Sequence, residues 1–106
     1  MRDTFIEAIH AKRKLRLTFY SQEDGRNLVR TCAPMDYGPS RRAKDKSDRN
    51  HLWDYDSDTK HHTLSLLPQQ VVSIEMLSDT FDPAEFITWN TSAFPWFVQR
   101  NWDSFS

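Results

Sequence analysis

The sequence predicts a mostly β (α+β) fold: a small five-stranded barrel with an N-terminal helix and a short, helical, aromatic-rich C-terminal extension. Polar and apolar residues alternate in two stretches, 63–66 and 71–76, which is typical of half-buried strands. Pro68 separates them, and a proline cannot continue a strand ladder because it lacks the N–H group and fixes φ. Residues 68–70 are therefore predicted to form one 3₁₀ turn at a corner of the barrel. The apolar residues expected to face the interior are Leu64, Leu66, Val72, Ile74 and Met76.

An amphipathic helix is predicted at the start of the chain. It is expected to begin at Asp3 or Thr4, since either side chain can cap a helix. It should end at the basic run 12–14, because cations are favourable at a helix C-terminus. A strand over 15–20 follows, where apolar and polar residues alternate.

A second strand is predicted over 27–33. Gly25 suits the turn before it, because glycine accepts a positive φ, and Pro34 is expected to end it. The pattern leaves the inward face open between two sets of alternating residues. These sets are Val29, Thr31 and Ala33, or Leu28, Arg30 and Cys32.

A charged loop at 41–49 leads into the last hairpin of the predicted barrel. The loop is rich in Lys and Arg and has almost no apolar residue, so we expect it to be solvated. A third strand is predicted over 51–56, and residues 56–60 form the hairpin loop into the strand at 63–66.

The extension begins with a helix signal. Asp82 is a good cap and Pro83 suits the first helical position, so a short helix through 86–89 is expected. The barrel with its helix should thus occupy residues 1–78, and the extension residues 79–106.

Composition favours one small domain. The chain has 106 residues and a formal net charge of −1, so any contact with nucleic acid needs a local basic patch. Cys32 is the only cysteine, which excludes an intrachain disulfide and a cysteine-based zinc site. No apolar run approaches the ~20 residues of a membrane span, and the first residues do not form a signal peptide. A cytoplasmic protein that does not interact with membranes is therefore expected.

The order of these elements resembles the WYL-domain family, which has an Sm-like, SH3-type barrel behind a short N-terminal helix. The likeness covers roughly the first four-fifths of the chain and depends on order and spacing. The tripeptide that names the family falls on residues 50–52, where only Leu52 is retained. The resemblance implies ligand sensing and nucleic-acid binding, as in bacterial regulators, here in a module without a helix-turn-helix. The matching stretches are 5–9, 17–20, Asp24-Gly25, 30–34, Leu52 with Tyr55-Asp56, 64–66 with Val72, and Phe81-Asp82-Pro83.

A basic and aromatic surface is the first candidate site. Arginines gather in the charged loop and on the strand before it, and arginine side chains bind phosphates. Aromatic residues of the third strand can stack on single-stranded bases. The alternative is a solvated charged loop with these aromatic residues in the core. The candidate residues for binding single-stranded RNA or DNA, or a nucleotide-like ligand, are Arg30, Arg41, Arg42, Arg49, Trp53 and Tyr55.

The aromatic tail is the second candidate site. Its rings are too numerous to be left in water, and the predicted core is thin for a chain of this length. The tail is expected either to dock on its own barrel or to anchor a partner, which includes a second copy of the chain. The candidate partner-binding residues are Phe94, Trp96, Phe97 and Trp102.

Other reactive residue types do not suggest an enzyme. Cys32, placed in mid-strand, is expected to be a small buried residue rather than a nucleophile. A metal site is not expected either, because adjacent histidines in a strand point to opposite faces. We expect a non-enzymatic module without metal or other cofactor. The residues considered as metal ligands are His51, His61, His62, Asp54, Asp56 and Asp58.

Overall fold

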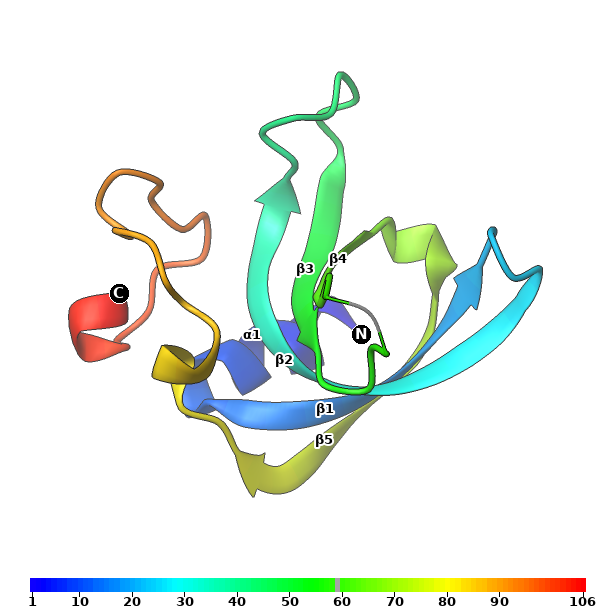
Figure 1. Cartoon of the computed structure of the whole chain (residues 1–106), viewed down its shortest axis with the longest axis horizontal. Helices are drawn as coiled ribbons and strands as arrows, with labels where there is room; N and C mark the ends of the chain where they lie inside the picture. Colours follow the sequence, from blue (N-terminus) through cyan, green and yellow to red (C-terminus); the bar gives the residue numbers. More distant parts are fainter. Residues whose placement is uncertain (59) are drawn as a thin grey trace.

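The computed structural model describes residues 1–58 and 60–106, and it is mostly β with one N-terminal α-helix (Figure 1). Thr59, in the predicted hairpin loop, lies outside the described residues. The elements in chain order are helix α1 (Arg2–Ala11), strands β1 (Arg13–Ser21), β2 (Arg26–Pro39), β3 (Asp48–Asp54) and β4 (Thr63–Leu66), 3₁₀ turn η1 (Pro68–Gln70), strand β5 (Val71–Thr80), and 3₁₀ turns η2 (Pro83–Glu85) and η3 (Asp103–Phe105).

The five strands form one curved antiparallel sheet in the order β4-β3-β2-β1-β5, and α1 packs against β1, β2 and β5. The predicted 3₁₀ turn at Pro68 is confirmed, since η1 connects β4 to β5. The predicted closure into a barrel is wrong. Among the described residues β4 pairs only with β3 and β5 only with β1, which leaves two open edges.

Helix α1 begins nearer the N-terminus than predicted. It starts at Arg2 with Met1 as the N-cap, and no side chain caps it, so the predicted start at Asp3 or Thr4 is wrong. The helix ends before Lys12, which takes the left-handed conformation with φ 53° and lets the chain reverse into β1. The inward residues of β1, all buried, are Leu15, Leu17 and Phe19.

Strand β2 is longer than predicted, because it continues through Pro34 to Pro39. The pairing register shifts between Pro34 and Asp36, so a β-bulge accommodates the missing proline N–H. The inward face of the strand is the one that carries Cys32, which is fully buried, whereas Val29 is exposed. Residues 32–36 are all buried, because both α1 and the end of the chain pack against this part of β2.

A bulge in β5 corrects the predicted interior face. Thr18 pairs with Ser73 and Phe19 with Val71, so Val72 is an extra residue on its strand. Val71 is therefore buried, and Val72 is 50% exposed instead of facing the interior. The members of the predicted interior set that do contact the core are Leu64, Leu66, Ile74 and Met76.

Residues 81–106 form a segment that we call the C-terminal arm. Asp82 caps turn η2 as predicted, but the helix expected through 86–89 is wrong, because the chain leaves the turn at once. Phe86 and Ile87 are both buried. An irregular path allows two consecutive side chains to enter the core, whereas a surface helix turns one of them outward.

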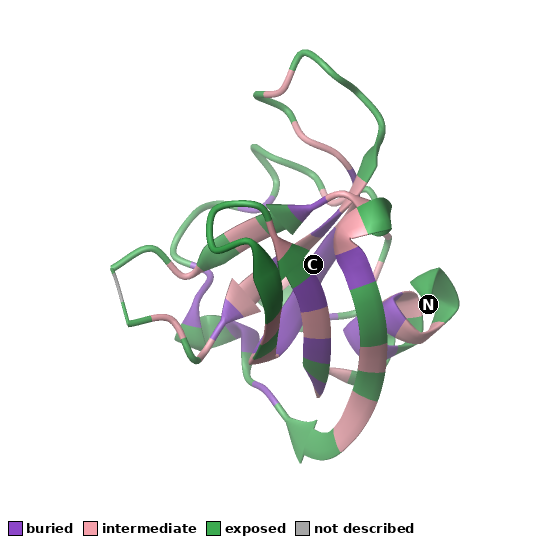
Figure 2. Cartoon of the chain, turned by 90° about the vertical axis from the view of Figure 1, so that its right-hand side faces the viewer, coloured by how far each residue is buried: buried purple, intermediate pink, exposed green. Residues whose placement is uncertain are grey.

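Buried and exposed residues alternate along the strands (Figure 2), and the arm adds four buried side chains to the core, Phe81, Phe86, Ile87 and Trp102. The indole N–H of Trp102 donates a hydrogen bond of 2.9 Å to the carbonyl oxygen of Ile9 in α1. The Trp102 ring also packs edge-on against Phe81, at 5.5 Å between ring centroids. The last residues thus cover the helix at the opposite end of the sequence.

Candidate functional site: a groove between the sheet and the C-terminal arm

An open groove of about 710 Å³ lies between the sheet and the C-terminal arm, and we call it the arm groove. The end of β2 and the loop after it form one side, β3 and β4 form the floor, and the arm forms the other side. Its chemically informative residues are Asp36, Arg41, Arg42, His51, Thr63, Ser65, Trp89, Phe94, Trp96 and Phe97.

Asp36 fixes the arm to the sheet. Its carboxylate accepts hydrogen bonds from the backbone N–H groups of Phe97, at 2.9 Å, and of Val98, at 3.0 Å. It also pairs with the guanidinium of Arg100 at 3.2 Å. The Arg100 side chain is 0% exposed and that of Asp36 only 9%, so this is a buried ion pair. Three groups of the arm therefore depend on one carboxylate of β2.

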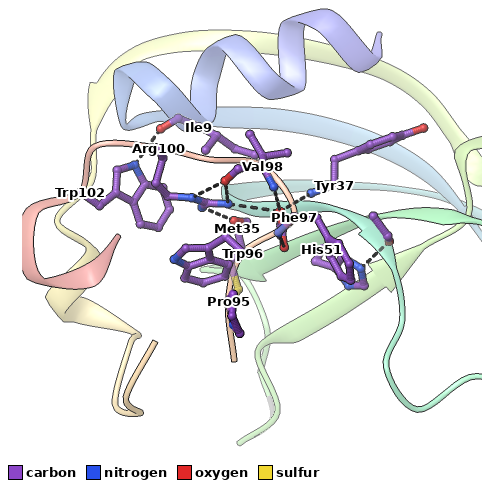
Figure 3. A network of polar contacts seen from close by, with 12 residues as sticks. Ile9, Met35, Tyr37, His51, Pro95, Trp96, Phe97, Val98, Arg100 and Trp102 are labelled. Atoms are coloured by element: carbon purple, nitrogen blue, oxygen red, sulfur yellow. Dashed lines mark hydrogen bonds and ion pairs between the residues drawn. The ribbon is translucent and has the colours of Figure 1, made fainter. Parts of the chain in front are cut away.

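Arg100 is held from several sides (Figure 3). Its guanidinium lies over the rings of Trp96 and Trp102, at 4.1 and 4.4 Å from their centroids. It also donates to the carbonyl oxygens of Met35 and Val98. Burial lowers the pKa of Arg100 to about 10, while the charge of Asp36 opposes that shift. The side chain is thus still a cation at neutral pH.

Two arginines from the loop after β2 give the groove its positive charge. Arg41 donates a hydrogen bond of 2.5 Å to the carbonyl oxygen of Pro95, and its guanidinium lies 5.0 Å from the Phe97 ring centroid. Arg42 is exposed beside it. The only acidic lining residue in the described part of the chain is Asp36, which is already paired with Arg100. The groove therefore favours an anionic ligand.

The floor carries a histidine and a hydroxyl. His51 faces Ser65 across β3 and β4, with 2.8 Å between its Nδ1 and the Ser65 Oγ. Its Nε2 lies 2.9 Å from the carbonyl oxygen of Gly38. Because a carbonyl oxygen only accepts, Nε2 carries a proton, and in the neutral ring Ser65 donates to Nδ1. The floor thus offers fixed polar groups between the arginine side and the aromatic side.

Of the six predicted nucleic-acid or ligand residues, the structure brings only Arg41 and Arg42 into the arm groove. Arg30 lies near Asp54 instead, with 3.6 Å between Nε and Oδ2. Arg49 is half-buried, and its Nε has no hydrogen-bond partner among the described residues.

The two aromatic residues of that prediction pack against the protein itself. Trp53 stacks on His62 and Phe86, with centroid distances of 4.8 and 5.7 Å. Tyr55 is half-buried, and the ammonium group of Lys14 lies 4.4 Å from its ring centroid. Both rings therefore stabilise the fold, as the alternative interpretation of the sequence proposed.

The predicted partner-binding residues divide into two groups. Trp102 is a core residue, and Trp96 is half-buried with its indole N–H donating to the carbonyl oxygen of Phe105 at 2.9 Å. Phe94 and Phe97 are 58% and 47% exposed. The arm thus docks on its own sheet and still presents two open rings at the groove.

Sequence reasoning missed Asp36, Arg100 and Trp89, each of which shapes the groove. A usable signal existed, because Asp36 is a single charge in an apolar stretch and Arg100 lies among the aromatic residues of the tail, and charged residues are rarely buried unless they pair. In residues 1–58 and 60–106, no group of three or more His, Cys, Asp or Glu side chains is arranged to hold a metal ion. No helix in the same residues has the length and apolar character needed to cross a membrane.

Comparison with protein-family models, with curated proteins and with solved structures finds no match to this chain. The function of the groove must therefore be inferred from its geometry and charge.

Proposed function

We propose that the chain is a non-enzymatic, divergent WYL-like module of the Sm-like and SH3-like class, and that its arm groove binds single-stranded nucleic acid or a nucleotide-like ligand. The order of helix, strands and 3₁₀ turn supports the family proposal. The groove supports the ligand proposal, because cations, exposed rings and polar groups line one open surface.

The observation that carries the ligand proposal is the pairing of Arg41 and Arg42 with open aromatic rings across one groove. Arginine binds phosphate by charge and by paired hydrogen bonds. Phe94 and Phe97 present faces on which bases can stack, and stacking tolerates any base. Duplexes keep their base faces covered, so the groove suits single strands better.

Fluorescence anisotropy with a labelled oligothymidylate tests this proposal. The double variant Arg41→Ala/Arg42→Ala should weaken binding and flatten its salt dependence. Each lost phosphate contact lowers the log–log salt slope by about 0.7, so two lost contacts lower it by about 1.4. The matched control is Arg16→Ala/Arg26→Ala, which removes the same charge from two exposed residues outside the groove.

Phe94→Ala tests the stacking side. Phe94 is 58% exposed, so its loss should leave the fold intact. If a base stacks on it, binding should weaken by about 1–3 kcal/mol. Absence of salt-dependent binding, or equal binding by the groove variant and its control, would contradict the proposal.

A second candidate is a protein-interaction or self-assembly module. The two exposed rings, Phe94 and Phe97, and the open edges of β4 and β5 favour it. Light scattering over a range of concentrations distinguishes it, because self-assembly predicts a mass that rises with concentration and that nuclease treatment does not change. The mass of Phe94→Ala should then stay lower at the same concentration.

A further inference from the structure

A second, smaller cavity of about 230 Å³ lies on the other side of the sheet, where the edges of β4 and β5 are left unpaired. Turn η1 borders it, as do the start of α1 and the inward side of β2, β3 and β5. No described residue lines both this cavity and the arm groove. Its chemically informative residues are Arg2, Tyr37, Asn50, Pro68, Val71 and Ile74.

Asn50 is the unusual member of this lining. It is 97% buried, because only 3% of its surface is exposed. Its backbone belongs to the β3 ladder, opposite Tyr37 and Leu66. Its side-chain amide, with two donor hydrogens and one acceptor oxygen, has no hydrogen-bond partner among the described residues. The amide is not one of the fully buried polar atoms without a partner, which are Arg49 Nε and Tyr55 Oη, so it is open to the cavity that it lines and can take a partner from it.

The rest of the lining defines what that partner would be. Pro68, Val71 and Ile74 give the cavity apolar walls. Among the described residues, Arg2 is the only lining residue with a charged side chain, and it is exposed. An apolar cavity of about 150 Å³ holds benzene, so a cavity of about 230 Å³ accepts a somewhat larger body. A ligand with a short hydrocarbon chain and one anionic, hydrogen-bonding end complements all three features.

We propose that this cavity binds a small carboxylic acid with a short hydrocarbon body. The carboxylate accepts a hydrogen bond from the Asn50 amide and is neutralised by Arg2 at the rim, and the hydrocarbon body lies against Val71 and Ile74. This site is independent of the arm groove and of the function proposed for it.

Octanoate is the probe, with 1-octanol as the matched ligand that lacks the carboxylate. Titration of the full chain is followed by calorimetry and by backbone amide NMR shifts. Octanoate should bind in a saturable way and shift the amides of residues around Asn50 and Val71. Octanol should bind at least tenfold more weakly, because hydrogen bonds to charged groups are the stronger ones.

Asn50→Leu separates recognition from folding. Leucine has a similar volume and no unpaired polar group, so the melting temperature should be unchanged or higher. Octanoate affinity should nevertheless fall at least tenfold, whereas the control Asn27→Leu, at an exposed position, should bind like the wild type.

Three outcomes would overturn the proposal: no binding of octanoate at millimolar concentration, octanol binding as tightly as octanoate, or Asn50→Leu binding as tightly as the wild type. None of them bears on oligonucleotide binding, because the two sites share no residue.

Discussion

Asp36→Asn should detach the C-terminal arm from the sheet. The wild-type carboxylate accepts from the N–H groups of Phe97 and Val98 and pairs with Arg100. An asparagine of the same shape keeps one acceptor oxygen, but its NH₂ group then faces another donor. Because the amide is neutral, the Arg100 cation also loses its counter-charge. Removal of one partner from a buried ion pair costs about 3–5 kcal/mol.

The structure places Asp36→Asn at the lower end of that range. Arg100 keeps its hydrogen bonds to two backbone carbonyls and its contacts with two indole rings, which leave the cation partly compensated. We therefore expect a loss of about 3 kcal/mol in the free energy of unfolding. At roughly 4–8 °C per kcal/mol for a domain of this size, the melting temperature should fall by about 12–24 °C.

Denaturant unfolding followed by tryptophan fluorescence measures this loss, since Trp96 and Trp102 lie against Arg100. Asp79→Asn, at an exposed position of β5, is the isosteric control and should change stability by less than about 0.5 kcal/mol.

The double variant Asp36→Asn/Arg100→Met should lose less stability than the sum of the single variants, because it also removes the uncompensated cation. If Asp36→Asn unfolds like its control, or if the two substitutions are additive, the carboxylate does not hold the arm in the way inferred from the structure.

Three further predictions concern buried groups and close packing. Burial raises the pKa of Tyr55 to about 12. The protonated phenol therefore stabilises the folded state below pH 10, and this contribution is lost as the pH rises through 12. In an ultraviolet titration, Tyr55→Phe should remove the tyrosine ionisation step near pH 12. Burial also raises the pKa of the Cys32 thiol, so a disulfide reagent should react slowly with the native protein and at once in denaturant. Gly38→Ala places a Cβ 2.6 Å from Cγ of Phe97, which should cost about 1–3 kcal/mol in chemical unfolding and displace a ring of the groove. Gly25→Ala is its contrast, because nothing lies within 4 Å and only the positive φ of 65° opposes the change.

Local patterns predicted the strands and the corner turn because those features depend on neighbouring residues. Alternation predicted β1 and β4, and Pro68 predicted the turn between β4 and β5. The errors arose where pairing with another strand decided the outcome. A bulge let β2 continue through Pro34, and another turned Val72 outward. Bulges depend on the partner strand's register, which no local pattern contains.

The arm groove was less predictable than the fold. Its parts come from the loop after β2, from β3 and β4, and from the arm, which are far apart in the sequence. Arginine clustering correctly pointed to Arg41 and Arg42 as surface cations, but composition could not tell the exposed Phe94 from the buried Trp102. The Asp36–Arg100 pair, which holds the arm on the sheet, joins residues that are 64 positions apart.

The hydrogen bond between Trp102 and Ile9 joins residues 93 positions apart, and this has a consequence for biosynthesis. A nascent chain cannot cover the last turn of α1 until Trp102 has emerged from the ribosome. The sheet can assemble earlier, but its apolar helix contact stays open until the C-terminal arm has been synthesised. Such late, non-local closure slows folding, and it makes the incomplete chain the form most in need of a chaperone.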